Sequence, residues 1–235
     1  MSCPTVTVKP IFLLADSRPL FGPESGMIRA SIGAESPRAV YIGASNGDDP
    51  SFYSIFEAAM EKIGIGSCRM IPASITDESA AFINQADIIL LAGGSVESGW
   101  RTFEANGLSQ TVIRRYGEGA TLIGVSAGAV QLGMFGWGEE EPSRENLFKT
   151  FNLVPYIVSA HDEERGWVAL QQAVNSVEVG GLGIPAGGGI IYHPDHTIEP
   201  LTHPVHEFAR DNERIRHYLL SPGQIEKAQE LTCVC

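Results

Sequence analysis

The sequence lacks a surplus of basic residues and any long apolar run. Its 16 lysines and arginines are outnumbered by 28 aspartates and glutamates, giving a formal net charge of −12. An acidic surface repels phosphate backbones and anionic lipids, so we expect neither nucleic acid nor membrane as a partner. No apolar stretch reaches the roughly 18 residues of a membrane span, and we see no signal peptide.

The sequence also lacks close cysteine pairs. Its four cysteines are Cys3, Cys68, Cys233 and Cys235, and no two of them form a C-x-x-C motif. This spacing is poor for a disulfide framework and for a metal site. We therefore expect a protein of the reducing cytoplasm that needs neither metal nor cofactor.

What is present is an alternation of short apolar runs with segments of helical periodicity. The apolar runs predict strands at residues 9–15, 38–44, 68–71, 87–92, 121–125 and 151–160. The periodic segments predict helices at residues 50–63, 76–85, 96–116, 127–133 and 164–176. Residues 177–208, rich in glycine, proline and histidine, predict antiparallel strands, and the last 25 or so residues a helical tail.

Strands that are apolar throughout are typical of a parallel sheet covered on both faces. We therefore predict a doubly wound, mostly parallel α/β fold with antiparallel strands near the C-terminus. The sequence contains no internal repeat, low-complexity tract or linker, and hydrophobic residues make up 43% of it. A single domain over residues 1–235 is the simplest prediction.

One motif carries chemistry. The residues Gly124-Val125-Ser126-Ala127-Gly128 form G-x-S-x-G between a predicted strand and a predicted helix. That context is typical of a nucleophile presented on a tight turn, so we predict that Ser126 attacks a substrate carbonyl. The N–H of Ala127, at the start of the helix, is placed to bind an oxyanion. A glycine-rich turn that only packs closely is the alternative.

Gly93-Gly94 ends the preceding apolar strand. The ends of parallel strands share one edge of a sheet, where ligands bind. Gly94 is therefore a candidate second oxyanion donor, and we expect Gly93 and Ser95 beside it to contact substrate. A turn that simply needs positive φ explains the glycines equally well.

A serine hydroxyl needs a base, and His161 is the best placed histidine because it ends an apolar stretch. The spacing of the later histidines, HPDH and HPVH, invites a zinc hypothesis, but the carboxylates and prolines around them fit solvated turns equally well. A carboxylate should orient His161, and Glu139, Glu140 and Glu141 in the loop after the nucleophile helix are candidates. A solvated acidic loop is the alternative for each glutamate.

The glycine pair, the G-x-S-A-G-A run, the loop carboxylates and L-V-P followed by a histidine together resemble the peptidase E / cyanophycinase family of serine peptidases. The resemblance covers roughly residues 9 to 210. It implies a fold similar to class I glutamine amidotransferases and hydrolysis of peptide bonds next to aspartate, α-linked or β-linked. Family members are monomers or dimers.

Carried onto this sequence, the resemblance implies Ser126 as nucleophile, His161 as base, and Gly94 and Ala127 as the oxyanion hole. The position of the family's acid implies Glu141, or Glu140 if a one-residue gap is placed before Pro142. The pocket departs from the pattern. Ser95-Val96 stand where cyanophycinases have glutamine, and of the arginines that follow the histidine only Arg165 is kept.

Arg165 is the candidate for binding a substrate carboxylate, because a guanidinium pairs with it bidentately. A surface ion pair with Asp162 or Glu163 is its alternative. We therefore predict a serine peptidase acting on small peptides, with a Ser-His-Glu triad and an acyl-enzyme. Two other functions fit less well: an esterase of the α/β-hydrolase type, and a non-catalytic binding module on the same fold.

Overall fold

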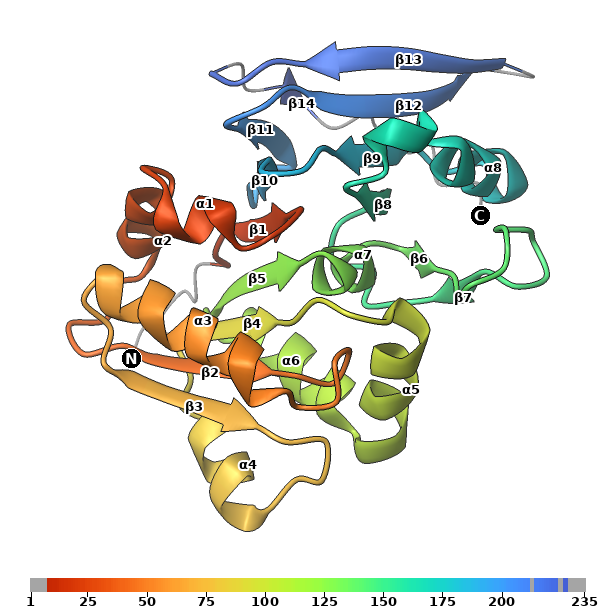
Figure 1. Ribbon diagram of the computed structural model, residues 1–235. Helices are drawn as coiled ribbons and strands as arrows, with labels where there is room; N and C mark the ends of the chain where they lie inside the picture. Colours follow the sequence, from red (N-terminus) through yellow and green to blue (C-terminus); the bar gives the residue numbers. More distant parts are fainter. Residues whose placement is uncertain (1–7, 212–213, 224–225, 228–235) are drawn as a thin grey trace, which may run out of the picture.

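The computed structural model describes residues 8–211, 214–223 and 226–227. Within them, one sheet has eight strands and forms the centre of the molecule (Figure 1). Across the sheet they run β14 (Glu226–Lys227), β11 (Thr197–Leu201), β10 (Gly189–Tyr192), β1 (Ile11–Leu14), β5 (Thr121–Val125), β4 (Ile88–Leu91), β2 (Arg38–Ile42) and β3 (Ser67–Ile71). The five from β1 to β3 are parallel, and β10, β11 and β14 pair antiparallel. The predicted mostly parallel α/β fold is confirmed.

Helices cover both faces of this sheet because successive strand residues point to opposite sides. One face is covered by α1 (Arg18–Phe21), α2 (Ser25–Ser31) and α3 (Pro50–Lys62). The other is covered by α4 (Asp77–Ile83), α5 (Val96–Asn106), α6 (Leu108–Gly117) and α7 (Ala127–Leu132). In β1, Leu14 packs with the first group and Leu13 with the second, so each face buries its own apolar core.

The predicted helix over residues 96–116 is two helices, α5 and α6. Gly107, with φ of +72°, ends the first in a left-handed conformation and the second starts beside it. A glycine adopts this conformation at little cost, so it divides a segment whose periodicity looks continuous.

A second sheet lies beside the first and was not separated from it in the sequence prediction. Its order is β13 (Arg214–Leu220), β12 (Val205–Asp211), β9 (Gly181–Ile184) and β8 (Ile157–Ala160). The helix α8 (Val168–Val177) packs on it through Leu170 and Val174. The short strands β6 (Phe135–Gly136) and β7 (Phe148–Lys149) pair separately, and the 3-10 turn η1 (Glu163–Arg165) follows β8.

The helical tail predicted for the last 25 or so residues is wrong where the structure describes it. β12 and β13 form an antiparallel hairpin in which Phe208 is opposite His217. Their rings stack with centroids 4.7 Å apart, a cross-strand contact that stabilises the pairing. Local periodicity could not reveal this partner strand.

No helix in the described ranges is both long enough and apolar enough to cross a bilayer. Cys68 is a partly buried free thiol, and burial raises its pKa to about 11. Cys3, Cys233 and Cys235 lie outside the described residues.

Candidate active site

Ser126 occupies the single position between β5 and α7, with φ of 50° and ψ of −110°. Positive φ is unfavourable for a residue with a side chain and persists only where the surroundings enforce it. Here the N–H of Ser126 donates to the carbonyl of Leu14 at 2.9 Å. Its own carbonyl accepts from Ala129 and Val130, at 2.9 and 3.1 Å. The predicted strand-to-helix turn around Ser126 is therefore present.

The two glycines of the motif are needed for packing. A Cβ on Gly124 would lie 2.6 Å from backbone atoms of Gly128. A Cβ on Gly128 would lie 2.1 Å from the carbonyl oxygen of Leu91 in the neighbouring strand β4. Only glycine allows α7 to start this close to the sheet.

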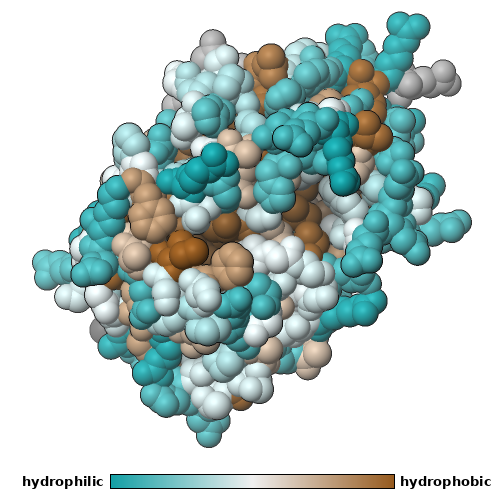
Figure 2. Space-filling model, viewed as in Figure 1, coloured by the Kyte–Doolittle hydropathy of each residue, from teal (hydrophilic) through white to brown (hydrophobic). Residues whose placement is uncertain are grey.

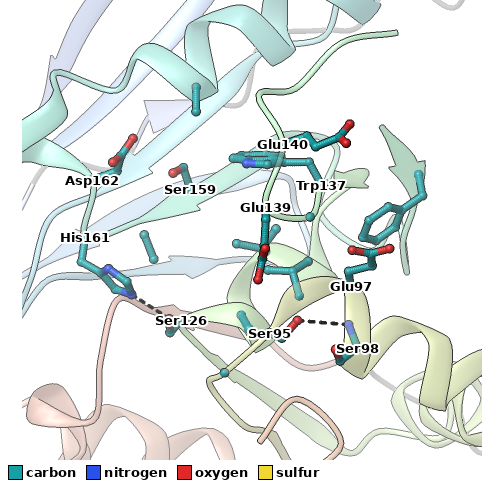
Figure 3. A pocket seen from close by; sticks show the side chains of 18 of the residues that line it. Ser95, Glu97, Ser98, Ser126, Trp137, Glu139, Glu140, Ser159, His161 and Asp162 are labelled. Atoms are coloured by element: carbon teal, nitrogen blue, oxygen red, sulfur yellow. Dashed lines mark hydrogen bonds between the residues drawn. The ribbon is translucent and has the colours of Figure 1, made fainter. Parts of the chain in front are cut away.

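The structure brings Ser126 and His161 together. The Ser126 Oγ is 2.7 Å from the His161 Nε2, as drawn in Figure 3. His161 follows β8 directly, and its N–H continues the ladder by donating to Ile184 at 2.9 Å. The imidazole makes no hydrogen bond to a carboxylate within the described part of the chain. The geometry is that of a nucleophile and its base.

Gly93 and Gly94 lie next to Ser126 at the end of β4. A Cβ on Gly93 would be 3.3 Å from the Cβ of Ser126. Gly94 has φ of +136°, and a Cβ there would lie 2.0 Å from the carbonyl oxygen of Ser45. The N–H groups of Gly94 and Ala127 donate to no acceptor among the described residues. Both are therefore available to a ligand.

A buried glutamine, which the sequence analysis missed, fixes this loop. Gln131 of α7 is fully buried, and its Nε2 donates to the Ser45 Oγ and to the Val96 carbonyl, both at 3.0 Å. The N–H of Ser95 donates to the Ser45 carbonyl at 2.8 Å. The sequence signal for this residue is a single amide in an otherwise apolar helix. Because buried polar groups normally have hydrogen-bond partners, such an amide indicates a buried contact with another segment.

A polar cavity of about 1010 Å³ opens at Ser126 and His161. Carboxylates and one guanidinium line it: Glu97, Glu139, Glu140, Asp162 and Arg165. Arg165 is exposed and forms no ion pair with any described carboxylate, so the alternative of a surface ion pair is not seen. Ser95 also lines the cavity, and its Oγ caps α5 by accepting from the Ser98 N–H at 3.2 Å.

Residues 14–199 match the model of peptidase family S51. The chain belongs to peptidase family S51. The matched segment contains the nucleophile turn, the acidic loop and His161. The comparison with curated protein sequences gives no significant match.

Solved structures share the fold. A peptidase from an acI-B1 Actinobacterium has a TM-score of 0.73 at 15% identity, covering 95% of this chain and 98% of its own. A putative peptidase E protein from Listeria monocytogenes EGD-e has a TM-score of 0.61 at 15% identity, covering 92% and 100%. At this identity the likeness shows the fold.

In this S51 chain the loop glutamates do not contact His161. The carboxylate of Glu141 is exposed and accepts from the Nε2 of Gln172 at 3.4 Å. Glu139 and Glu140 lie across the cavity from His161, and Glu140 points away from it (Figure 3). The sequence position predicts that a carboxylate of this loop orients His161, but in the structure the loop carboxylates lie away from the imidazole. The structure therefore does not assemble the expected Ser-His-Glu arrangement.

Asp16, which belongs to none of the motifs in the sequence, follows β1 at the same sheet edge. Burial raises the pKa of its carboxyl, but the Arg18 side chain and the N–H groups of Arg18 and Gly187 outweigh this and lower the pKa overall. The Gly187 N–H donates to it at 2.7 Å. The strand-end rule that selected Gly94 would have found this residue too.

Several of the later histidines of the S51 chain contact other side chains. His193 contacts Glu199 at 2.9 Å, and His206 contacts His217 at 2.9 Å. No three histidine, cysteine or carboxylate side chains in the described ranges lie close enough together to hold a metal ion.

Proposed function

We propose that this S51 peptidase is a serine peptidase that hydrolyses small peptides next to an aspartyl residue, α-linked or β-linked. The observation that supports this most is the 2.7 Å contact between the Ser126 Oγ and the His161 Nε2, at the mouth of an open polar cavity. A hydroxyl held against an imidazole is activated for attack when substrate arrives.

In the proposed reaction His161 accepts the proton of Ser126 while the hydroxyl oxygen attacks the scissile carbonyl. The tetrahedral intermediate then breaks its C–N bond, and His161 returns the proton to the leaving amine. Water, deprotonated in turn by His161, releases the acid product from the acyl-enzyme. Since no described carboxylate contacts the imidazole, the proposal rests on the Ser126–His161 pair. A loop glutamate would orient His161 only if the loop moves.

The N–H groups of Gly94 and Ala127 are the proposed oxyanion donors. Both are free of protein acceptors among the described residues and flank Ser126. One such donor typically stabilises the transition state by about 3 kcal/mol. Rigid donors matter because they need no reorganisation when charge develops on the oxygen.

Arg165 is the proposed partner of the aspartyl carboxylate. It lines the polar cavity and is not neutralised by a described carboxylate. Glu97 and Glu139, which line the same cavity, suit the α-ammonium group of a short peptide. A small peptide with both charges would therefore find complementary groups in the cavity beside Ser126.

The test is hydrolysis of a dipeptide library that varies the N-terminal residue and its linkage, with Ser126→Ala as the control. We expect cleavage of aspartyl dipeptides and none by the control. A fluorophosphonate probe should label the native protein at Ser126. Absence of labelling would favour a non-catalytic binding module, and cleavage of esters without peptides would favour an esterase.

A further inference from the structure

A second cavity, of about 290 Å³, also opens at Ser126 and His161 but extends in another direction. The polar cavity runs toward α5 and η1, whereas this one runs toward α1 and α3. The volume is at the lower end of the roughly 300–1,000 Å³ of ligand pockets. We call it the apolar cavity.

The apolar cavity has a hydrophobic floor and a hydrophobic rim. Leu20, Tyr41 and Phe56 lie in the floor and are each 2% exposed. Phe52 and Ile55 on α3 form the rim and remain 50% and 40% exposed. Figure 2 shows hydrophobic residues gathered around a hollow over α1 and α3. Exposure of a large apolar side chain to water is unfavourable, so the free energy of the system falls when a ligand covers it.

The carboxylate that lines the apolar cavity is already paired within the protein and does not need a polar ligand. Asp16 lines it, but its carboxylate accepts from the Arg18 Nε at 3.0 Å and from the Gly187 N–H at 2.7 Å. Those contacts satisfy the carboxylate within the protein. The cavity therefore favours an uncharged hydrocarbon group over a charged one.

The direction of the reaction assigns the two cavities to two parts of the substrate. The acyl part and the leaving amine extend to opposite sides of the carbonyl that Ser126 attacks. If Arg165 in the polar cavity holds the aspartyl carboxylate, the acyl part lies there. The residue that leaves with the amine, next to His161, then lies toward the apolar cavity.

We propose that the apolar cavity binds the side chain of the residue on the leaving side, and that this residue is leucine, isoleucine or phenylalanine. This inference rests on the proposed function, because it takes the acyl part to be aspartyl. It narrows the substrates to aspartyl peptides whose second residue is large and apolar.

The test compares kcat/KM for Asp-Leu and Asp-Phe with kcat/KM for Asp-Ser and Asp-Lys, in the linkage that the library identifies. We expect the apolar substrates to be preferred at least about tenfold, because a hydrophobic pocket discriminates by this order for a few methylene groups. Equal values for leucine and serine would overturn the proposal.

A variant at the rim links the preference to the cavity. Ile55→Glu should lower the ratio of Asp-Leu to Asp-Ser cleavage about tenfold and raise relative cleavage of Asp-Lys. The matched control is Ile113→Glu on α6, a site that is 44% exposed and belongs to the helices on the other sheet face. It should leave the ratio and the overall activity unchanged. A ratio unaffected by Ile55→Glu would contradict the assignment.

A second readout separates failure of this inference from failure of the proposed function. If no aspartyl dipeptide is cleaved, the proposed function fails, and labelling of Ser126 by a fluorophosphonate still tests the cavity. L-Phenylalanine should slow labelling more than L-serine does, and Ile55→Glu should remove that difference. Equal protection by the two amino acids would show that the apolar cavity binds no such side chain.

Discussion

The hydroxyl of Ser126 and the imidazole of His161 meet at 2.7 Å although they follow strands of two different sheets. Both residues have positive φ, 50° for Ser126 and 47° for His161. Strained conformations at both partners are typical of sites where geometry matters more than local stability. The ends of β5 and β8, which are hydrogen-bonded into separate sheets, thus bring the Ser126 hydroxyl and the His161 imidazole into hydrogen-bond contact.

Replacing the base tests this relationship first. His161→Ala should lower kcat by at least about a thousandfold, because Ser126 then has no group to accept its proton. The measurement is steady-state hydrolysis of the best dipeptide from the library. An unchanged far-ultraviolet circular dichroism spectrum serves as the folding control. A loss below about tenfold would rule out His161 as the base.

For the acidic loop we expect only small changes in kcat, in contrast to the large loss expected for His161→Ala. Glu139→Gln, Glu140→Gln and Glu141→Gln should each change kcat by less than about tenfold, because none of these carboxylates contacts His161. Steady-state kinetics of the three variants are the measurement. A thousandfold loss in any one of them would show that the loop closes over the imidazole during the reaction.

The oxyanion site predicts a severe effect from one methyl group. In Gly94→Ala the new Cβ would lie 2.0 Å from the Ser45 carbonyl oxygen at a φ of +136°, so the loop must move. Loss of one donor should lower kcat by about a hundredfold to a thousandfold. Steady-state kinetics measure the loss of the donor, and thermal unfolding measures any loss of stability from the displaced loop. Fully retained kcat would remove Gly94 from the oxyanion hole.

Arg165 tests substrate recognition. Arg165→Ala should raise KM for aspartyl dipeptides by about tenfold to a hundredfold, since a charge-assisted pair with the substrate is lost. Arg165→Lys should recover part of the binding, because the charge remains while the bidentate geometry does not. The check compares aspartyl dipeptides with the same dipeptides carrying a carboxamide in place of the free aspartyl carboxylate. If both substrates respond alike, Arg165 does not bind the carboxylate.

The histidine pair on the hairpin gives a pH dependence of stability. Burial and the neighbouring His217 lower the pKa of His206, against the opposing charge of Glu163. The unfolded chain therefore binds this proton at a higher pH than the folded chain does. The stabilisation is present above the unfolded pKa of about 6.5 and is lost as the pH falls through the folded pKa.

Thermal unfolding between pH 7.5 and 5 checks this expectation. The melting temperature should fall toward pH 5, and His206→Gln should flatten that decline. His203→Gln is the matched control, since His203 is exposed in the turn between β11 and β12. Identical pH slopes for the native protein and the His206 variant would contradict the prediction.

Local sequence determined much of the molecule. The parallel strands β1 and β4 are fully apolar, and β2 and β5 are apolar after their first residue, which leaves few alternatives to a sheet buried on both faces. The G-x-S-x-G motif identified the strand-to-helix turn at Ser126, because the close backbone approach at Gly124 and Gly128 excludes a Cβ there. His161 followed from its place at the end of an apolar strand.

Only the tertiary structure decided which groups share the site. The second sheet and the β12–β13 hairpin depend on pairing between strands, which local periodicity does not encode. The acidic loop lies near Ser126 in sequence, yet its carboxylates stay away from His161, while Asp16 lies at the cavity wall. Local backbone geometry fixed the presentation of Ser126, and contacts between distant segments fixed the cavities around it.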